Sequence, residues 1–264
     1  MSAEPGRPGW RLLPDEWVLT LKNLIYPQFC RTCDARLLTE ENGYFCPQCW
    51  AGSLRVERPF CNMCGRPHEQ GVGFGTRSNF PCEVCRISPP ENVRRVWGAA
   101  IYDGPIADAI KLLKFNGKIR LARVLGELLI EFASEEMSQE DYDRIVPVPL
   151  HPVRQRSRGF NQSVLLAQAV QCAFPRAILD ESLKRIRPTH TQSRLTGAER
   201  HNSLRGAFAL IGDRLEGQRV LLIDDVVTTG GTVSECARAL RRAGVHQVDV
   251  LAVALAVPQK WDPT

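Results

Sequence analysis

Long hydrophobic runs are missing from this sequence of 264 residues. The best candidate for a membrane-spanning helix, residues 248–257, is far shorter than the roughly 18 apolar residues that such a helix needs. The N-terminal residues include charges and prolines where a secretory signal has its apolar segment, so we expect no signal peptide. Apolar residues make up 44% of the chain, which excludes a disordered protein. We therefore expect a folded, cytoplasmic protein without membrane insertion.

Two common nucleotide-binding patterns are missing as well. The chain contains neither GxxxxGK[ST] nor GxGxxG, so the sequence does not indicate a nucleoside-triphosphate loop or a dinucleotide loop. Aromatic residues make up only 7% of the chain, and Phe160, Phe174 and Phe208 are the only phenylalanines in or beside its most basic segment. A stacking platform for single-stranded nucleic acid therefore has little support from the sequence.

Positive charge is concentrated in one segment of the chain. Residues 144–205 carry 11 Lys and Arg against 3 Asp and Glu, whereas the whole chain has a net charge of +5. A local excess of this kind is typical of a surface that binds phosphate groups. The alternative is a solvated basic face that binds nothing.

Eight of the ten cysteines form four CxxC pairs, and the gaps between successive pairs are 12, 11 and 17 residues. Two thiolates with this spacing bind one Zn²⁺ from a tight turn, and two such turns complete a tetrahedral site. Four sulfur ligands leave no open coordination position, so the two predicted zinc ions are structural. The predicted ligands are Cys30, Cys33, Cys46, Cys49, Cys61, Cys64, Cys82 and Cys85.

The cysteine pattern has alternative interpretations. A disulfide framework is disfavoured without a secretory signal, and four repeated pairs do not fit a single redox dithiol. The pairing of the four turns is a separate question: adjacent pairs would give two sequential zinc ribbons, whereas interleaved pairs would give one cross-braced unit. We favour sequential ribbons because loops of 12 and 17 residues close easily.

From about residue 95 the apolar pattern alternates between strands and helices. Residues 220–223 form a continuous apolar run, typical of a strand buried on both faces, and residues 121–132 have helical spacing. Such alternation predicts an α/β fold with a mostly parallel sheet covered by helices. We divide the chain into an N-terminal extension with a short helix over 17–25 (1–27), a double zinc ribbon (28–94) and an α/β domain (95–264).

The strongest functional signal follows the predicted strand at residues 220–223. Two adjacent carboxylates, Asp224 and Asp225, precede a loop rich in Thr and Gly and then a predicted helix. Loop N–H groups and a helix N-terminus together bind phosphate, and carboxylates accept hydrogen bonds from a sugar diol. The alternative is a capped surface turn. It would not explain why two carboxylates, whose burial costs free energy, lie at the end of a buried strand. We therefore predict a sugar-phosphate site at this edge of the sheet.

This segment, IDDVVTTGGT, resembles the phosphoribosyl pyrophosphate (PRPP) motif of type I phosphoribosyltransferases. Further segments resemble the signature of the ComF family: KxxKFxG at 111–117, VPVPLH at 146–151, RGFNQ at 158–162 and RxN at 200–202 followed by Phe208. The four CxxC pairs are similar to the double zinc ribbon of that family. The resemblance, which extends to amidophosphoribosyltransferase-like domains, implies a type I phosphoribosyltransferase-like fold preceded by a small double zinc-ribbon domain.

The resemblance also implies roles for individual residues. Asp224 and Asp225 would bind the ribose hydroxyls together with Mg²⁺, and residues 228–232 would hold the 5′-phosphate. The implied PRPP-binding set is Asp224, Asp225, Val226, Val227, Thr228, Thr229, Gly230, Gly231 and Thr232. A turn after Pro149 would be the pyrophosphate loop, with Leu150, His151, Arg154, Arg156, Arg158 and Gly159. A mobile basic flap over 184–200 would close over the leaving group through Lys184, Arg185, Gln192 and Arg200.

Two functions follow from the resemblance. The first is Mg²⁺-dependent transfer of phosphoribose from PRPP to an unknown acceptor, in a protein with a role in DNA uptake during natural transformation. The second is a non-catalytic protein on the same fold, which senses PRPP or holds single-stranded DNA for a competence helicase. The sequence shows no recognisable pocket for an acceptor base, and it does not indicate an oligomeric state.

Overall fold

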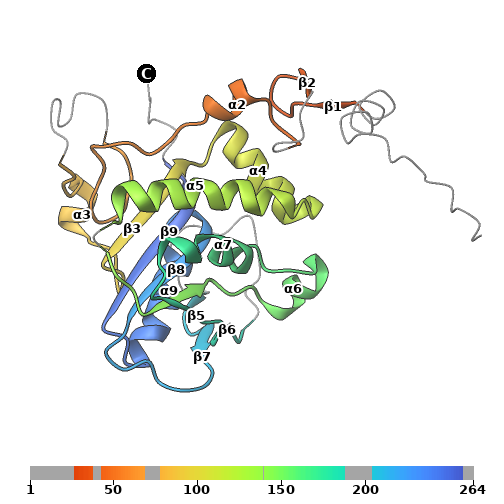
Figure 1. The fold of residues 1–264 in the computed structure, drawn as a ribbon. Helices are drawn as coiled ribbons and strands as arrows, with labels where there is room; N and C mark the ends of the chain where they lie inside the picture. The colour runs from red at the N-terminus through yellow and green to blue at the C-terminus, as the bar shows by residue number, and fades with distance from the viewer. Residues whose placement is uncertain (1–26, 38–42, 69–77, 139, 188–203, 258–264) are drawn as a thin grey trace, which may run out of the picture.

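The computed structural model describes residues 27–37, 43–68, 78–138, 140–187 and 204–257 (Figure 1). The helix expected over residues 17–25 lies outside these ranges. In chain order the elements are β1 (Gln28–Phe29), β2 (Arg36–Leu37), α2 (Pro47–Ala51), α3 (Glu83–Ile87), β3 (Arg95–Ile101), α4 (Gly104–Asn116), α5 (Arg120–Glu136), β4 (Arg144–Pro147), α6 (Pro152–Arg158), α7 (Gln162–Val170), the 3₁₀ turn η1 (Gln171–Ala173), β5 (Ile178–Leu179), β6 (Leu183–Arg185), β7 (Phe208–Leu210), β8 (Arg219–Val227), α9 (Gly231–Arg242) and β9 (Gln247–Leu255).

The main sheet has five strands in the order β3-β9-β8-β4-β5, and every neighbouring pair is parallel. Strands β8 and β9 lie at its centre, and nearly all of their residues are buried. This explains why both strands are almost continuously apolar in sequence, because helices cover both faces of such a sheet. The predicted α/β fold with a mostly parallel sheet is confirmed.

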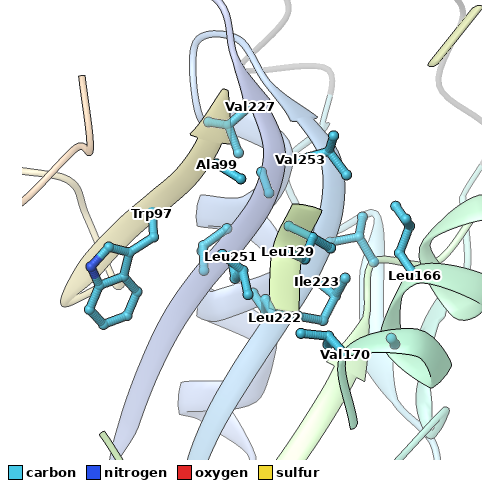
Figure 2. Close-up of a cluster of buried hydrophobic side chains, with 14 of the residues drawn as sticks. Trp97, Ala99, Leu129, Leu166, Val170, Leu222, Ile223, Val227, Leu251 and Val253 are labelled. Carbon is cyan, nitrogen blue, oxygen red and sulfur yellow. The ribbon is translucent and has the colours of Figure 1, made fainter. Parts of the chain in front are cut away.

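Helices cover the sheet from both sides. Figure 1 shows α5 and α7 in front of the sheet and α9 behind it. Figure 2 shows Leu129 of α5 and Leu166 of α7 gathered over the central strands. Helices α5 and α7 also pack closely on each other, because a Cβ atom at Gly126 would lie 2.4 Å from the Cβ of Ala169. Glycine at position 126 therefore allows the two helices to approach.

Two helices end or begin at residues whose types favour that position. Helix α4 stops at Asn116 because Gly117 adopts a left-handed conformation with φ of 64°. Asn161 caps α7, and its side-chain oxygen accepts a hydrogen bond of 3.0 Å from the backbone N–H of Ser163. These caps set the positions of two chain segments that lie beside the functional site.

The cysteine-rich segment is attached to the edge strand β3. The backbone N–H of Val56 donates to Ala99 (3.1 Å), and that of Ile101 donates to Leu54 (2.8 Å). Further along, the N–H of Val96 donates to the carbonyl of Met63 at 2.9 Å. The ribbon chain therefore continues the hydrogen bonding of the sheet beyond β3.

Near the start of β9, a buried carboxylate links this strand to neighbouring segments of the chain. Asp249 is fully buried, and it accepts hydrogen bonds from the Nε and Nη2 atoms of Arg94 at 3.0 and 2.6 Å. The hydroxyl of Tyr142 donates to the same carboxylate at 2.9 Å. Burial and the negative charge of Asp249 raise the pKa of Tyr142 above its ordinary value. This network joins the end of the ribbon segment to β9 and to the chain before β4.

The structure differs from the sequence prediction in three places. Strand β8 continues to Val227, so the acid pair lies inside the strand rather than after it. A short helix, α6, forms where a turn after Pro149 was expected, because Pro152 starts a helix that His151 caps. Strand β5 and the antiparallel pair β6–β7 were not predicted. None of the helices in the described residues is both long and apolar enough to span a bilayer.

Candidate functional site

The eight paired cysteines form two clusters of four. Cys30, Cys33, Cys46 and Cys49 make up the first cluster, and Cys61, Cys64, Cys82 and Cys85 the second, with all sulfur atoms of a cluster within 4.8 Å of one another. A tetrahedral ion with Zn–S distances near 2.3 Å would place its sulfurs about 3.8 Å apart. The Sγ atoms of Cys33 and Cys46 are 3.7 Å apart, and those of Cys64 and Cys82 are 3.9 Å apart. The sequential pairing is confirmed, and both clusters fit structural zinc.

The backbone around the clusters stabilises thiolates. In the second cluster, the N–H groups of Cys64 and Cys82 point at the sulfur of Cys61, at 3.4 and 3.3 Å. A hydrogen bond with the Cys64 side chain, opposed by burial and supported by backbone N–H donors, lowers the pKa of Cys61 to about 4. Cys61 is therefore favoured as a thiolate, the form that binds zinc, whereas its negative charge and burial raise the pKa of Cys64 and Cys85.

The acid pair is buried at the carboxyl end of β8. Asp224 and Asp225 are 7% and 3% exposed. The hydroxyl of Ser163 donates to Asp224 Oδ1 at 3.3 Å, and the amide of Gln162 donates to Asp225 Oδ1 at 3.1 Å. Lys114 forms an ion pair with Asp225 Oδ2. The two acids are therefore held by the first turn of α7 and by the last turn of α4.

The charge of Asp224 is only partly compensated. Burial and the neighbouring negative charge of Asp225 raise its pKa well above the ordinary value, although Lys114 opposes this shift. Two adjacent buried carboxylates cost stability unless a ligand uses them. A perturbed acid in such a position is typical of a binding or catalytic site.

A loop after β8 leads from the acid pair into α9. We call residues 228–232 the Thr/Gly loop; within it, Gly230 has φ of 79°, and Gly231 begins a helix of 12 residues. A cavity of about 100 Å³ lies over this loop and is lined by residues 226–233 together with Leu204 and Asp224. The backbone of the loop, the N-terminus of α9 and one of the acids thus share a small cavity, as binding of a sugar phosphate requires.

Basic residues lie on the other side of the acid pair. Arg158, in the last turn of α6, donates to the side-chain oxygen of Gln162, which holds Asp225. Burial lowers the pKa of Arg158, while the charge of Asp225 raises it and that of Arg154 lowers it. Burial and the charge of Arg154 also lower the pKa of Arg185 on β6. Arg154 therefore lies within electrostatic range of both Arg158 and Arg185, and Arg158 lies within range of Asp225.

The remaining predicted residues have different positions. Arg156 and Lys184 are exposed on α6 and β6, and Leu150 is partly buried just before α6. The ring nitrogen Nδ1 of His151 accepts a hydrogen bond from the N–H of Val153 (3.3 Å) and so caps α6. Gln192 and Arg200 lie outside the described residues. Gly159 ends α6 in a left-handed conformation with φ of 84°.

Four residues at the site had no individual role in the sequence analysis. Lys114 and Phe115 belong to KxxKFxG, and Gln162 ends RGFNQ, so these three residues lie in segments that resemble the ComF signature. Ser163 had no such signal, because its contact with Asp224 depends on how α7 packs against β8.

A larger cavity lies between the second ribbon and the Thr/Gly loop. Its volume is about 710 Å³, and its walls include Cys64, Phe80, Thr228 and Leu255. The guanidinium of Arg66 extends from the ribbon and donates to the carbonyl of Thr228 at 3.1 Å. Arg66, which follows Cys64 by two residues, therefore links the second ribbon to the loop after β8.

Comparison with known proteins agrees with this architecture. Residues 21–86 match the double zinc ribbon domain, and residues 128–264 match the phosphoribosyl transferase domain. The DNA utilization protein YhgH of Escherichia coli is 35% identical over 230 residues, covering 86% of this chain and 96% of its own length. Competence protein F of Haemophilus influenzae is 30% identical with the same coverage. Competence protein ComFC of Streptococcus pneumoniae is 26% identical and covers 88% of this chain and 91% of its own.

The comparisons and the structure indicate the same architecture. They agree in the order of the domains, the all-parallel sheet, the two Cys₄ clusters and the length matched by the relatives. The chain therefore belongs to the ComF family, in which a double zinc ribbon precedes a phosphoribosyltransferase domain of the type I fold.

Proposed function

We propose that the protein binds PRPP with Mg²⁺ and transfers its phosphoribosyl group to a nucleophilic acceptor. One observation carries this proposal: the buried pair Asp224 and Asp225 lies beside a cavity formed by a Thr/Gly loop and the N-terminus of α9. The carboxylates suit the hydroxyls of a ribose, and the loop suits the 5′-phosphate of the same molecule.

The basic side of the site suits the pyrophosphate. Lys114 and Arg158 lie beside Asp225, with Arg154 within electrostatic range of Arg158, and their charges would stabilise negative charge on the leaving group. In the proposed reaction the bond between the anomeric carbon and the pyrophosphate oxygen breaks while a bond to the acceptor forms. Bound Mg²⁺, for which adjacent carboxylates are suitable ligands, would neutralise charge on the pyrophosphate.

Lys114 would have a second role in the free protein. Its ion pair with Asp225 compensates a buried carboxylate, and binding of a cation and a diol would replace that pair. The ammonium group would then be available to the pyrophosphate. The proposal therefore gives Lys114 different partners before and after ligand binding.

Calorimetric titration of PRPP with Mg²⁺ into the zinc-loaded protein tests the proposal. We expect saturable binding that is lost in Asp225→Asn and retained in Asp213→Asn, which removes an exposed carboxylate outside the site. Pyrophosphate release would then be measured with nucleobases and with single-stranded DNA as acceptors. A folded, zinc-loaded protein that does not bind PRPP would contradict the proposal.

A second candidate is a non-catalytic role in handling single-stranded DNA. The exposed face of α6 carries Arg154 and Arg156, which suits a polyanion, and the relatives named above are a DNA utilization protein and competence proteins. This function predicts affinity for oligonucleotides that decreases steeply with salt, because phosphate contacts release counterions. PRPP binding without release of pyrophosphate in the presence of any acceptor would favour this function over transfer.

A further inference from the structure

One large apolar side chain at the site is exposed to solvent. Phe115 is 76% exposed, although the other face of α4 buries Ile106, Ile110 and Leu113 completely. The residue lies one position before the end of α4, directly after Lys114. Phe115 therefore lies outside the buried stripe of its helix, and its ring does not contribute to the core.

Phe115 is linked to the acid pair in two ways, through its neighbour in sequence and through side-chain contacts. Its neighbour in sequence, Lys114, forms the ion pair with Asp225. In space, the guanidinium carbon of Arg158 is 5.7 Å from the centroid of the Phe115 ring. Arg158 donates to Gln162, and Gln162 donates to Asp225 at 3.1 Å. The exposed ring is thus on the rim of the proposed ribose site.

The chemistry of this rim differs from that of the rest of the site. The ribose and phosphate positions present carboxylates, backbone N–H groups and cations, whereas Phe115 presents an apolar ring face with a planar guanidinium beside it. Aromatic rings and guanidinium groups both stack on nucleobases, and such stacking tolerates any base because every base has a π face. A free phosphate or a sugar gains little from an apolar ring.

We propose that Phe115, supported by Arg158, is a stacking platform for a nucleobase beside the acid pair. The base can belong to a free acceptor, in which case this inference rests on the proposed transfer reaction, or to a single strand of nucleic acid, in which case it does not. The sequence gives no signal for this platform, because the ring comes from α4, outside the basic segment 144–205. The fold brings the aromatic ring and the arginines together from separate parts of the chain.

Paired binding measurements test the platform. Fluorescence anisotropy with a labelled 20-residue oligodeoxythymidylate covers the nucleic-acid source, and calorimetry with adenine and uracil in the presence of PRPP and Mg²⁺ covers the free base. Loss of one stack is expected to weaken binding of at least one probe by about 5- to 150-fold in Phe115→Ala. Phe115→Trp, which keeps a flat aromatic face, is expected to bind within about threefold of the wild type.

A matched control separates stacking from a general loss of apolar surface. Ile87→Ala removes a side chain that is 80% exposed on α3 of the second ribbon, and it is expected to leave both affinities unchanged. Equal affinities of Phe115→Ala and the wild type for all probes would overturn the proposal, as would a wild type that binds none of them. A wild type that binds the oligonucleotide through Phe115 but does not bind PRPP would contradict the transferase and support the platform.

Discussion

Asp224→Asn is expected to make the free protein more stable while destroying its ligand site. Asparagine keeps an oxygen that can accept the hydrogen bonds from Ser163 and from the backbone N–H of Asp225, so the substitution removes a charge and little else. Removing an incompletely compensated buried charge in this way is expected to raise the free energy of unfolding by about 1–4 kcal/mol. For a chain of this size the melting temperature would rise by about 2–4 °C for each kcal/mol.

The effect is expected to depend on pH with a definite sign. Because burial and the charge of Asp225 raise the pKa of Asp224 above 3.8, the folded state holds this proton more tightly than the unfolded state. The contribution of Asp224 to folding stability is complete at pH values below its pKa in the unfolded state, and it is lost as the pH rises through its pKa in the folded state. The loss is about 1.4 kcal/mol for each unit by which the two pKa values differ. The gain of the variant over the wild type should therefore be small near pH 4 and larger at pH 7.

Thermal unfolding monitored by calorimetry at several pH values measures this difference directly. Asp249→Asn is the matched control, because Asp249 is equally buried but fully paired with Arg94. Removing one partner of such a pair leaves the other uncompensated, so Asp249→Asn is expected to cost about 3–5 kcal/mol. The reasoning is refuted if Asp224→Asn is no more stable than the wild type at pH 7, or if its gain is the same at both pH values.

Three further predictions concern the ribbons and the helix packing. Cys61→Ser is expected to reduce bound zinc, measured by atomic absorption, from two ions per chain to one, because four thiolates form the second cluster. Arg66→Gln is expected to accelerate hydrogen exchange in the Thr/Gly loop by removing the hydrogen bond to the carbonyl of Thr228, with Arg66→Lys partly restoring protection; exchange as slow as in Arg86→Gln, a control from the same ribbon, would contradict this. Gly126→Ala is expected to lower stability in urea unfolding by about 1–3 kcal/mol despite the better helix propensity of alanine, because the new Cβ would lie 2.4 Å from that of Ala169; rescue by Ala169→Gly checks the cause.

Much of the local chemistry could be predicted from the sequence because it depends on residues close together in the chain. The CxxC spacing places two sulfurs on one turn, and loops of moderate length allow adjacent turns to share a metal. The continuous apolar run before Asp224 requires a strand buried on both faces, and the Thr/Gly segment requires a loop before a helix. Each of these patterns is contained in a short segment, so the sequence determined the two cysteine clusters and the association of the acid pair with a buried strand, although β8 includes both acids.

The surroundings of the acid pair were decided only by the tertiary structure. Lys114 and Ser163 are far from Asp224 and Asp225 in sequence, and they contact these acids because α4 and α7 meet the carboxyl end of β8. Arg158 of α6 is connected to Asp225 through Gln162. The hydrophobic periodicity of the sequence does not predict such contacts, since they depend on strand order and on how closely helices pack. For the same reason the exposed ring of Phe115 became part of the site only in the fold: a parallel sheet gathers residues from distant segments at one edge.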